Sequence, residues 1–206
     1  MKIGIFDSGS GGLGVLQELR RELPTTSFIY YGDWARMPYG DKPVEVVLEY
    51  SLEIIRSLVA AGVDMIVVAC NTAWVSGVSS MKFDVPIFGV VEPTLEYIKA
   101  TSIGRVGLAA TTVTVNSKVY GCMPSVACPR FVPLIESGNL GEELDTAIAE
   151  YFGQLLGIGL QAIILGCTHY PIIEDKIKEF LVRAGEGHIQ LINPAKHAAI
   201  AIASKA

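Results

Sequence analysis

Short apolar runs alternate with longer amphipathic segments along most of the chain. The apolar runs are rich in β-branched residues, which is typical of strands buried on both faces; they cover residues 3–6, 28–31, 65–69, 87–90, 106–109, 162–165 and 189–192. The amphipathic segments have apolar residues at helical spacing and cover residues 13–23, 44–61, 142–156, 172–184 and 195–205. This alternation predicts an α/β fold with mostly parallel sheets and helices on their faces.

The sequence also contains a weak internal repeat. Residues 62–71 resemble residues 159–168 at an offset of 97, and residues 3–8 resemble residues 106–111 at an offset of 103. Two independent matches at nearly equal offset predict two similar halves. We therefore expect two pseudo-symmetric three-layer α/β domains with the active site in the cleft between them.

The repeat also predicts where the domains begin and end. The first domain is expected to comprise residues 1–93 together with residues 191–206, and the second to comprise residues 94–190. Pro93 is expected to begin the crossover, and the Asn193–Pro194 pair to begin the return. The last helix should then pack back onto the first domain.

Composition excludes several classes of protein. Half of the 206 residues are hydrophobic and only 18% are charged, which excludes a disordered chain. The net charge is −5 and no basic block occurs, so no nucleic-acid partner is expected. No apolar run approaches the roughly twenty residues of a membrane span, and Asp7 interrupts the region where a signal peptide is apolar. The four cysteines form no CxxC pair, so a cytoplasmic location is expected.

A glycine-rich loop follows the first predicted strand. Gly9, Gly11 and Gly14 fit the pattern GxGxxG, and Asp33 lies near the distance expected for a ribose-binding acid. This favours a nicotinamide-dependent oxidoreductase as one hypothesis. Asp7 weakens that hypothesis, because its carboxylate would repel the pyrophosphate that such a loop binds.

Two cysteines end buried strands at matching places in the two halves. Cys70 is followed by Asn71, and Cys167 by Thr168, so each cysteine is expected to precede a helix. Ligands of parallel sheets bind beyond the carboxyl ends of the strands, so both thiols should face a site. A helix N-terminus there is expected to lower the thiol pKa toward neutrality.

His169 lies two residues after Cys167, and the sequence offers no second pair of metal ligands beside it. We therefore interpret His169 as a proton partner of the thiol rather than as half of a zinc site. Two opposed thiols suit the removal of an α-proton from an amino acid and its return to the other face. The polar groups expected to hold the carboxylates and the ammonium are Ser8, Asn71, Thr72, Thr111 and Thr168.

Six motifs resemble those of the cofactor-independent glutamate racemases. They are FDSGSGG at 6–12, ARMPYG at 35–40, VACNTA at 68–73, EP at 92–93, FVPLIE at 131–136 and LGCTHYP at 165–171. The resemblance implies two α/β domains, interconversion of L- and D-glutamate without pyridoxal phosphate or metal, and supply of D-glutamate for peptidoglycan. It leaves open whether the chain forms a homodimer.

The resemblance also implies a role for particular residues. Cys70 would deprotonate D-glutamate with help from Asp7, and Cys167 would deprotonate L-glutamate with help from Glu136 and His169. The residues implied to bind substrate are Ser8, Pro38, Tyr39, Gly40, Asn71, Thr72, Thr111, Thr114 and Thr168.

Two further hypotheses stay open at this point. One is a racemase for aspartate or another amino acid, and the other is a non-catalytic amino-acid-binding relative. The sequence also departs from the family at three positions: Ser10 stands where Val is common, and Trp34 and Trp74 stand where small residues are usual. We expect Ser10 to be a tolerated loop change. Each Trp would either pack domain against domain or reshape the pocket.

Overall fold

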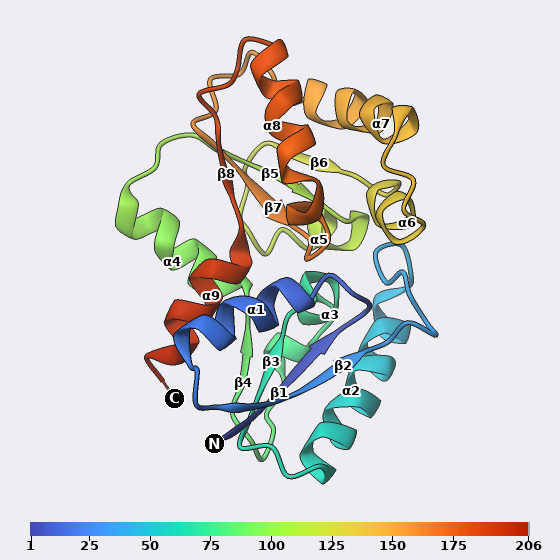
Figure 1. Ribbon diagram of the computed structural model, residues 1–206, viewed down its shortest axis with the longest axis vertical. Coiled ribbons are helices and arrows are strands. Elements are labelled where there is room, and N and C mark those ends of the chain that lie inside the picture. Colours follow the sequence, from blue (N-terminus) through green and yellow to red (C-terminus); the bar gives the residue numbers. More distant parts are fainter. Residues whose placement is uncertain (206) are drawn as a thin grey trace.

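The computed structural model describes residues 1–205 and contains two four-stranded parallel sheets, one in each half of the chain (Figure 1). The first sheet has the order β2-β1-β3-β4, and the second has the order β6-β5-β7-β8. The strands of the first sheet are β1 (Lys2–Asp7), β2 (Ser27–Gly32), β3 (Met65–Val68) and β4 (Ile87–Gly89). Those of the second are β5 (Val106–Ala110), β6 (Ser125–Ala127), β7 (Ala162–Gly166) and β8 (Gln190–Ile192).

Helices cover both faces of each sheet, which gives the expected three layers. The helices of the first half are α1 (Leu13–Glu22), α2 (Val44–Ala60), α3 (Asn71–Val75) and the short 3-10 helix η1 (Val78–Ser80). The remaining helices are α4 (Val91–Thr101), α5 (Thr112–Ser117), α6 (Phe131–Glu136), α7 (Glu142–Gly153), the 3-10 helix η2 (Tyr170–Ile173), α8 (Glu174–Arg183) and α9 (Pro194–Ala203). Two α/β domains result, as the sequence predicted.

The equal strand order of the two sheets explains the internal repeat. β1 and β3 occupy the two central positions of the first sheet, and β5 and β7 occupy them in the second. Connections leave the two central strands of each sheet in opposite directions, so the ends of these strands form a switch point where ligands of α/β proteins bind. Cys70 and Cys167 follow β3 and β7, so they occupy equivalent places.

The core of the first domain has two parts, one on each face of its sheet. Phe6 and Val68 pack toward α2, while Ile5 and Val67 pack toward α1 and α9. Helix α9 therefore returns to the first domain, as expected, and its alanines lie against α1 and α4. In Figure 1 this red helix lies beside the blue α1 at the lower half of the molecule.

The expected domain boundaries fall inside secondary-structure elements. β8 pairs with β7, so residues 191 and 192 belong to the second sheet, and the return to the first domain starts after them. The other expected boundary, between residues 93 and 94, falls inside α4. Ala206, the last residue assigned to the first domain, lies outside the described residues.

Candidate active site

A small cavity lies between the domains, where the carboxyl ends of the two sheets meet. Its volume is about 10 Å³, which is room for about one water molecule, so the two domains are closed on each other. Its walls come from the loops after β1, β3, β5 and β7, from the loop before α2, and from α6. The lining residues are Ser8, Pro38, Tyr39, Gly40, Cys70, Asn71, Thr72, Thr111, Val132, Cys167, Thr168 and His169.

The two thiols line this one cavity from opposite domains. Cys70 is the N-cap of α3, and its sulfur accepts a hydrogen bond from the Ala73 N–H at 3.5 Å. The Cys70 thiol also donates to Ser8 Oγ at 3.7 Å. Cys167 is 7% exposed, and its sulfur lies 3.9 Å from His169 Nδ1. The thiols are therefore buried, face the same space and have different polar neighbours.

A histidine and a carboxylate stand behind Cys167. His169 Nε2 lies 2.5 Å from Glu136 Oε1, and this carboxylate oxygen also accepts hydrogen bonds from the Ser10 N–H at 3.2 Å and the Ser10 hydroxyl at 2.8 Å. Burial acts to raise the pKa of Glu136, but these hydrogen bonds outweigh it and the pKa is lowered from its ordinary value. Glu136 does not line the cavity. It contacts His169, and His169 in turn contacts the Cys167 thiol.

Asp7 ends β1 and is fully buried. Its carboxylate accepts hydrogen bonds from the Gly9 N–H at 3.1 Å and from Thr168 Oγ1 at 3.2 Å, so it joins the glycine loop to the second domain. Burial raises the pKa of the Asp7 carboxyl, although His169 and these hydrogen bonds act to lower it. Like Glu136, Asp7 is absent from the residues that line the cavity.

The pKa values of both thiols are raised, not lowered as the sequence predicted. Burial first, and then the carboxyl of Asp7, raise the pKa of Cys70, while the Ala73 N–H and Ser8 act to lower it; the net pKa is about 12. Burial likewise raises the pKa of Cys167 well above its ordinary value. Loss of hydration around a thiolate therefore outweighs the start of a short helix. A thiolate formed in this cavity is a correspondingly strong base.

Hydroxyl groups form the wall between the two domains. Thr72 Oγ1 and Thr111 Oγ1 lie 2.9 Å apart, and Thr111 in turn donates to Thr114 Oγ1 at 3.0 Å. Thr114 is fully buried and does not line the cavity, so it contacts Thr111 instead of the space where a ligand would lie. The other residues implied to bind substrate all line the cavity.

The loop that carries Tyr39 is held by a buried acid. Asp33 is 4% exposed; its carboxylate accepts hydrogen bonds from the Tyr39 hydroxyl and, at 2.7 Å, from Arg36 Nε. Arg36 also donates to Glu53 at 2.5 Å. Asp33 therefore fixes one wall of the cavity and does not face open space as a ribose-binding acid would.

The glycine loop packs against the second domain. A Cβ atom at Gly11 would lie 2.5 Å from Thr168 Oγ1 and 2.6 Å from His169 Nδ1. A Cβ atom at Gly12 would lie 2.5 Å from that of Asp7. The second domain thus fills the space in which a dinucleotide phosphate would have to lie, which argues against the oxidoreductase hypothesis.

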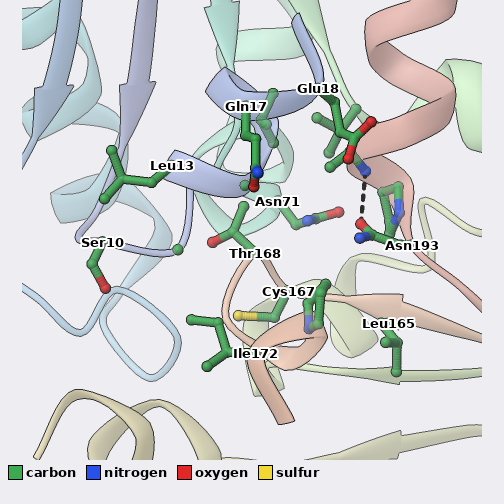
Figure 2. A pocket seen from close by; sticks show the side chains of 17 residues that line it. Ser10, Leu13, Gln17, Glu18, Asn71, Leu165, Cys167, Thr168, Ile172 and Asn193 are labelled. Carbon is green, nitrogen blue, oxygen red and sulfur yellow. Dashed lines mark hydrogen bonds between the residues drawn. The ribbon is translucent and has the colours of Figure 1, made fainter. Parts of the chain in front are cut away.

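A second, larger cavity of about 480 Å³ adjoins the first and is shown in Figure 2. The two cavities share Asn71, Cys167 and Thr168 as lining residues. Leu13 and Gln17 line the larger cavity from α1, and it reaches Asn193 at the start of α9. Cys167 therefore borders open space in the larger cavity, although the cavity between the two thiols is closed.

Several contacts of the site were missed from sequence. Val132 lines the cavity, Ser10 bonds Glu136 across the domains, and Tyr120 donates to Asn71 Oδ1 at 2.7 Å. Trp34 is 54% exposed and packs over Tyr30 in the first domain. Trp74 is buried and donates to Glu92 at 2.9 Å. Both tryptophans are absent from the residues that line the cavity between the thiols.

Within residues 1–205, no group of three or more His, Cys, Asp or Glu side chains is placed to hold a metal ion. Across the same residues, no helix combines the length and the apolar character that crossing a membrane requires.

Comparison with known proteins decides the family. Residues 35–202 match the family described as Asp/Glu/Hydantoin racemase. The chain belongs to this racemase family. It is 38% identical over 218 residues to a glutamate racemase of Persephonella marina, which covers all of this chain and 82% of that relative.

Solved structures of this racemase family have the same fold. A glutamate racemase from Francisella tularensis in complex with D-glutamate has a TM-score of 0.89 and 32% identity, over 99% of this chain and 80% of that one. An aspartate racemase from Picrophilus torridus has a TM-score of 0.68 over 99% of this chain and 93% of that one. Its identity of 17% shows a shared fold only.

Proposed function

We propose that this racemase interconverts L- and D-glutamate by two-base proton transfer, without a cofactor. The observation that carries the proposal is the pair of thiols, Cys70 and Cys167, which reach one closed cavity from equivalent ends of β3 and β7. The known relatives named glutamate racemase, which match the chain over most of its length, support glutamate as the substrate.

The reaction starts with one cysteine as thiolate and the other as thiol. The thiolate takes the α-proton, so the Cα–H bond breaks, an S–H bond forms, and the electron pair spreads into the carboxylate of the substrate. The opposite thiol then gives its own proton to the other face of Cα and is left as thiolate. Two bases are needed because the two faces of Cα point in opposite directions.

The closed cavity suits the unstable carbanion. The site holds about one water molecule, so stray protonation by solvent is limited, and desolvation makes the thiolate a stronger base. The Ser8 hydroxyl can donate to the charge that develops on the carboxylate. The hydroxyls of Thr72 and Thr111 bond to each other and to Thr114 in the closed cavity, so they would have to turn toward the substrate to donate to it. A glutamate molecule is far larger than the cavity, so the domains have to separate before substrate enters.

Asp7 would assist Cys70, and the pair Glu136 and His169 would assist Cys167. Asp7 is close enough to Cys70 for its carboxyl to raise the pKa of that thiol. His169 Nδ1 lies 3.9 Å from the sulfur of Cys167. The wider proposal is an enzyme of the cytoplasm whose D-glutamate feeds peptidoglycan. Its assembly as a homodimer stays a prediction, which the mass of the protein in solution tests.

Proton NMR in heavy water tests the proposed activity. Each enantiomer of glutamate and of aspartate is incubated with the protein, and loss of the α-proton signal is followed. We expect loss from both enantiomers of glutamate in the wild type, and no conversion of one enantiomer into the other in Cys70→Ala or Cys167→Ala. Faster loss from aspartate would instead favour the aspartate racemase hypothesis. Binding of glutamate without loss from either amino acid would favour a non-catalytic relative.

A further inference from the structure

Tyr120 reaches from the second domain to a residue of the active site in the first. It lies shortly after α5 and is 2% exposed. Its hydroxyl donates to Asn71 Oδ1 at 2.7 Å. Asn71 is the first residue of α3 and lines the cavity beside both thiols. The contact therefore joins the domains at the site itself.

The amide of Asn71 has two orientations, related by a half turn about its last bond. One leaves the N–H groups for a ligand, and the other leaves the oxygen. Within residues 1–205, the Tyr120 hydroxyl has no hydrogen-bond partner other than Asn71. Turning the amide around would leave the buried hydroxyl proton of Tyr120 without an acceptor, which costs free energy. The phenol thus selects the orientation in which the N–H groups stay available.

We propose that Tyr120 is a positioning residue that keeps the amide N–H groups of Asn71 turned toward the cavity, where they donate to a carboxylate of the amino-acid substrate. This inference rests on the proposed function. Asn71 is itself 2% exposed and belongs to the wall shared by the two cavities. An amide oxygen in its place would repel a carboxylate, so the orientation decides whether Asn71 helps or hinders binding.

The surroundings keep Tyr120 a hydrogen-bond donor. Burial raises the pKa of its hydroxyl far above the ordinary value, and the nearby acidic groups of Glu92 and Cys167 raise it further. The hydroxyl therefore stays protonated at neutral pH. Because the two residues belong to different domains, the amide is fixed only when the domains are closed.

The test is Tyr120→Phe, which keeps the ring and removes the hydroxyl. The carboxylate is bound in the ground state and in the transition state alike, so we expect KM for glutamate to rise about tenfold or more while kcat changes less. The same substitution in an Asn71→Ala background should give no further rise in KM, because Tyr120 acts through the Asn71 amide. A purely structural role would add its effect in both backgrounds and would lower Tm in both.

Tyr151→Phe is the matched control. Tyr151 is also buried, lies on α7 away from the cavity, and its hydroxyl accepts a hydrogen bond from Arg130 at 3.1 Å. Its loss should leave KM unchanged. An unchanged KM in Tyr120→Phe, or an equal rise in KM in the Asn71→Ala background, would overturn the inference. The Kd for D-glutamate is also measured by calorimetry for the wild type and for Tyr120→Phe. This comparison tests the role of Tyr120 in binding even if the protein shows no turnover and the proposed function is wrong.

Discussion

The two thiols share one cavity but have different polar partners. Ser8 and Asp7 stand beside Cys70, whereas His169, backed by Glu136, stands beside Cys167. An imidazole bonded to a carboxylate readily exchanges a proton with a neighbouring thiol, whereas a buried carboxylate acts mainly through its charge and its own proton. We therefore expect each side of the substrate to be served by its own set of groups.

Asp7→Asn should slow α-proton exchange mainly from D-glutamate, and His169→Asn mainly from L-glutamate. Loss of a group that assists proton transfer costs on the order of 10²–10⁴-fold. Steady-state racemisation cannot show such a bias, because the equilibrium constant fixes the ratio of the kcat/KM values in the two directions. Exchange of the α-proton into heavy water is therefore followed from each pure enantiomer at early times. His197→Asn on α9 is the control, and it should change neither rate. Equal losses from both enantiomers in both variants would remove the side-specific assignment.

Residues that carry their own chemistry could be predicted from the sequence, and residues that act through a distant contact could not. The cysteines and His169 stand in motifs with recognisable chemistry. Ser10 bonds Glu136 across 126 positions, and Tyr120 bonds Asn71 across 49. Nothing in a single sequence marks such pairs, because the partners are far apart along the chain and come together only in the folded protein. The predicted direction of the thiol pKa shift was wrong for a related reason. Burial raises both values, and burial depends on every residue that surrounds the cavity.

At the scale of the element, two helices with a proline near their start, α4 and α6, were not predicted from the sequence. Pro93 and Pro133 lie in the first turns of α4 and α6, where backbone N–H groups have no partner within the helix and proline is tolerated. Because Pro93 was expected to begin a crossover, no helix was predicted at α4. The buried strands were predicted well because parallel strands covered on both faces are almost uniformly apolar. The exception is the three-residue β6, which is too short to show a pattern.

Gly11→Ala should lower activity on the order of 100-fold, because its Cβ would lie 2.5 Å from Thr168 Oγ1 and push the catalytic loops apart. Gly14→Ala is the matched control in the same segment. Gly14 lies in α1 with no atom within 4 Å of the added Cβ, so activity should persist and stability should rise slightly. Racemisation rates and Tm of both variants check this. Full activity in Gly11→Ala would mean that the loop does not need its close approach to the second domain.

The whole molecule is a pair of similar domains joined by a shared apolar cluster and by polar contacts at the site. The bonds from Ser10 to Glu136, from Thr168 to Asp7 and between Thr72 and Thr111 all cross from one domain to the other. The repeat in the sequence predicted the two domains. Their boundaries could not be located from it, because one predicted boundary falls inside the continuous helix α4 and the other inside β8, a strand of the second sheet.

Acid should weaken the closed form through Glu136. Its pKa is lowered in the folded protein, so its contribution to stability is present above the ordinary pKa of 4.5 and is lost as pH falls through the lowered folded value. At neutral pH, Glu136→Gln should lower Tm by about 2–4 °C, and this difference should shrink as the pH falls below 4.5. Glu150→Gln, which removes an exposed ion pair with Arg130, should change Tm little at either pH. A Tm difference for Glu136→Gln that does not vary with pH would contradict the assignment.

The origin of the α-proton in the product tests the two-base reaction most directly. L-glutamate is incubated with the protein in heavy water, the reaction is stopped early, and both enantiomers are separated and analysed by mass spectrometry. Cys70 and Cys167 reach the cavity from different domains, so the thiol that protonates the second face is not the one that removed the proton. In heavy water, that second thiol carries a deuteron taken from the solvent. The D-glutamate formed should therefore carry deuterium at Cα, while the remaining L-glutamate keeps its proton. D-glutamate that retains the original proton would show that one group both removes and returns it, and would contradict the two-base account.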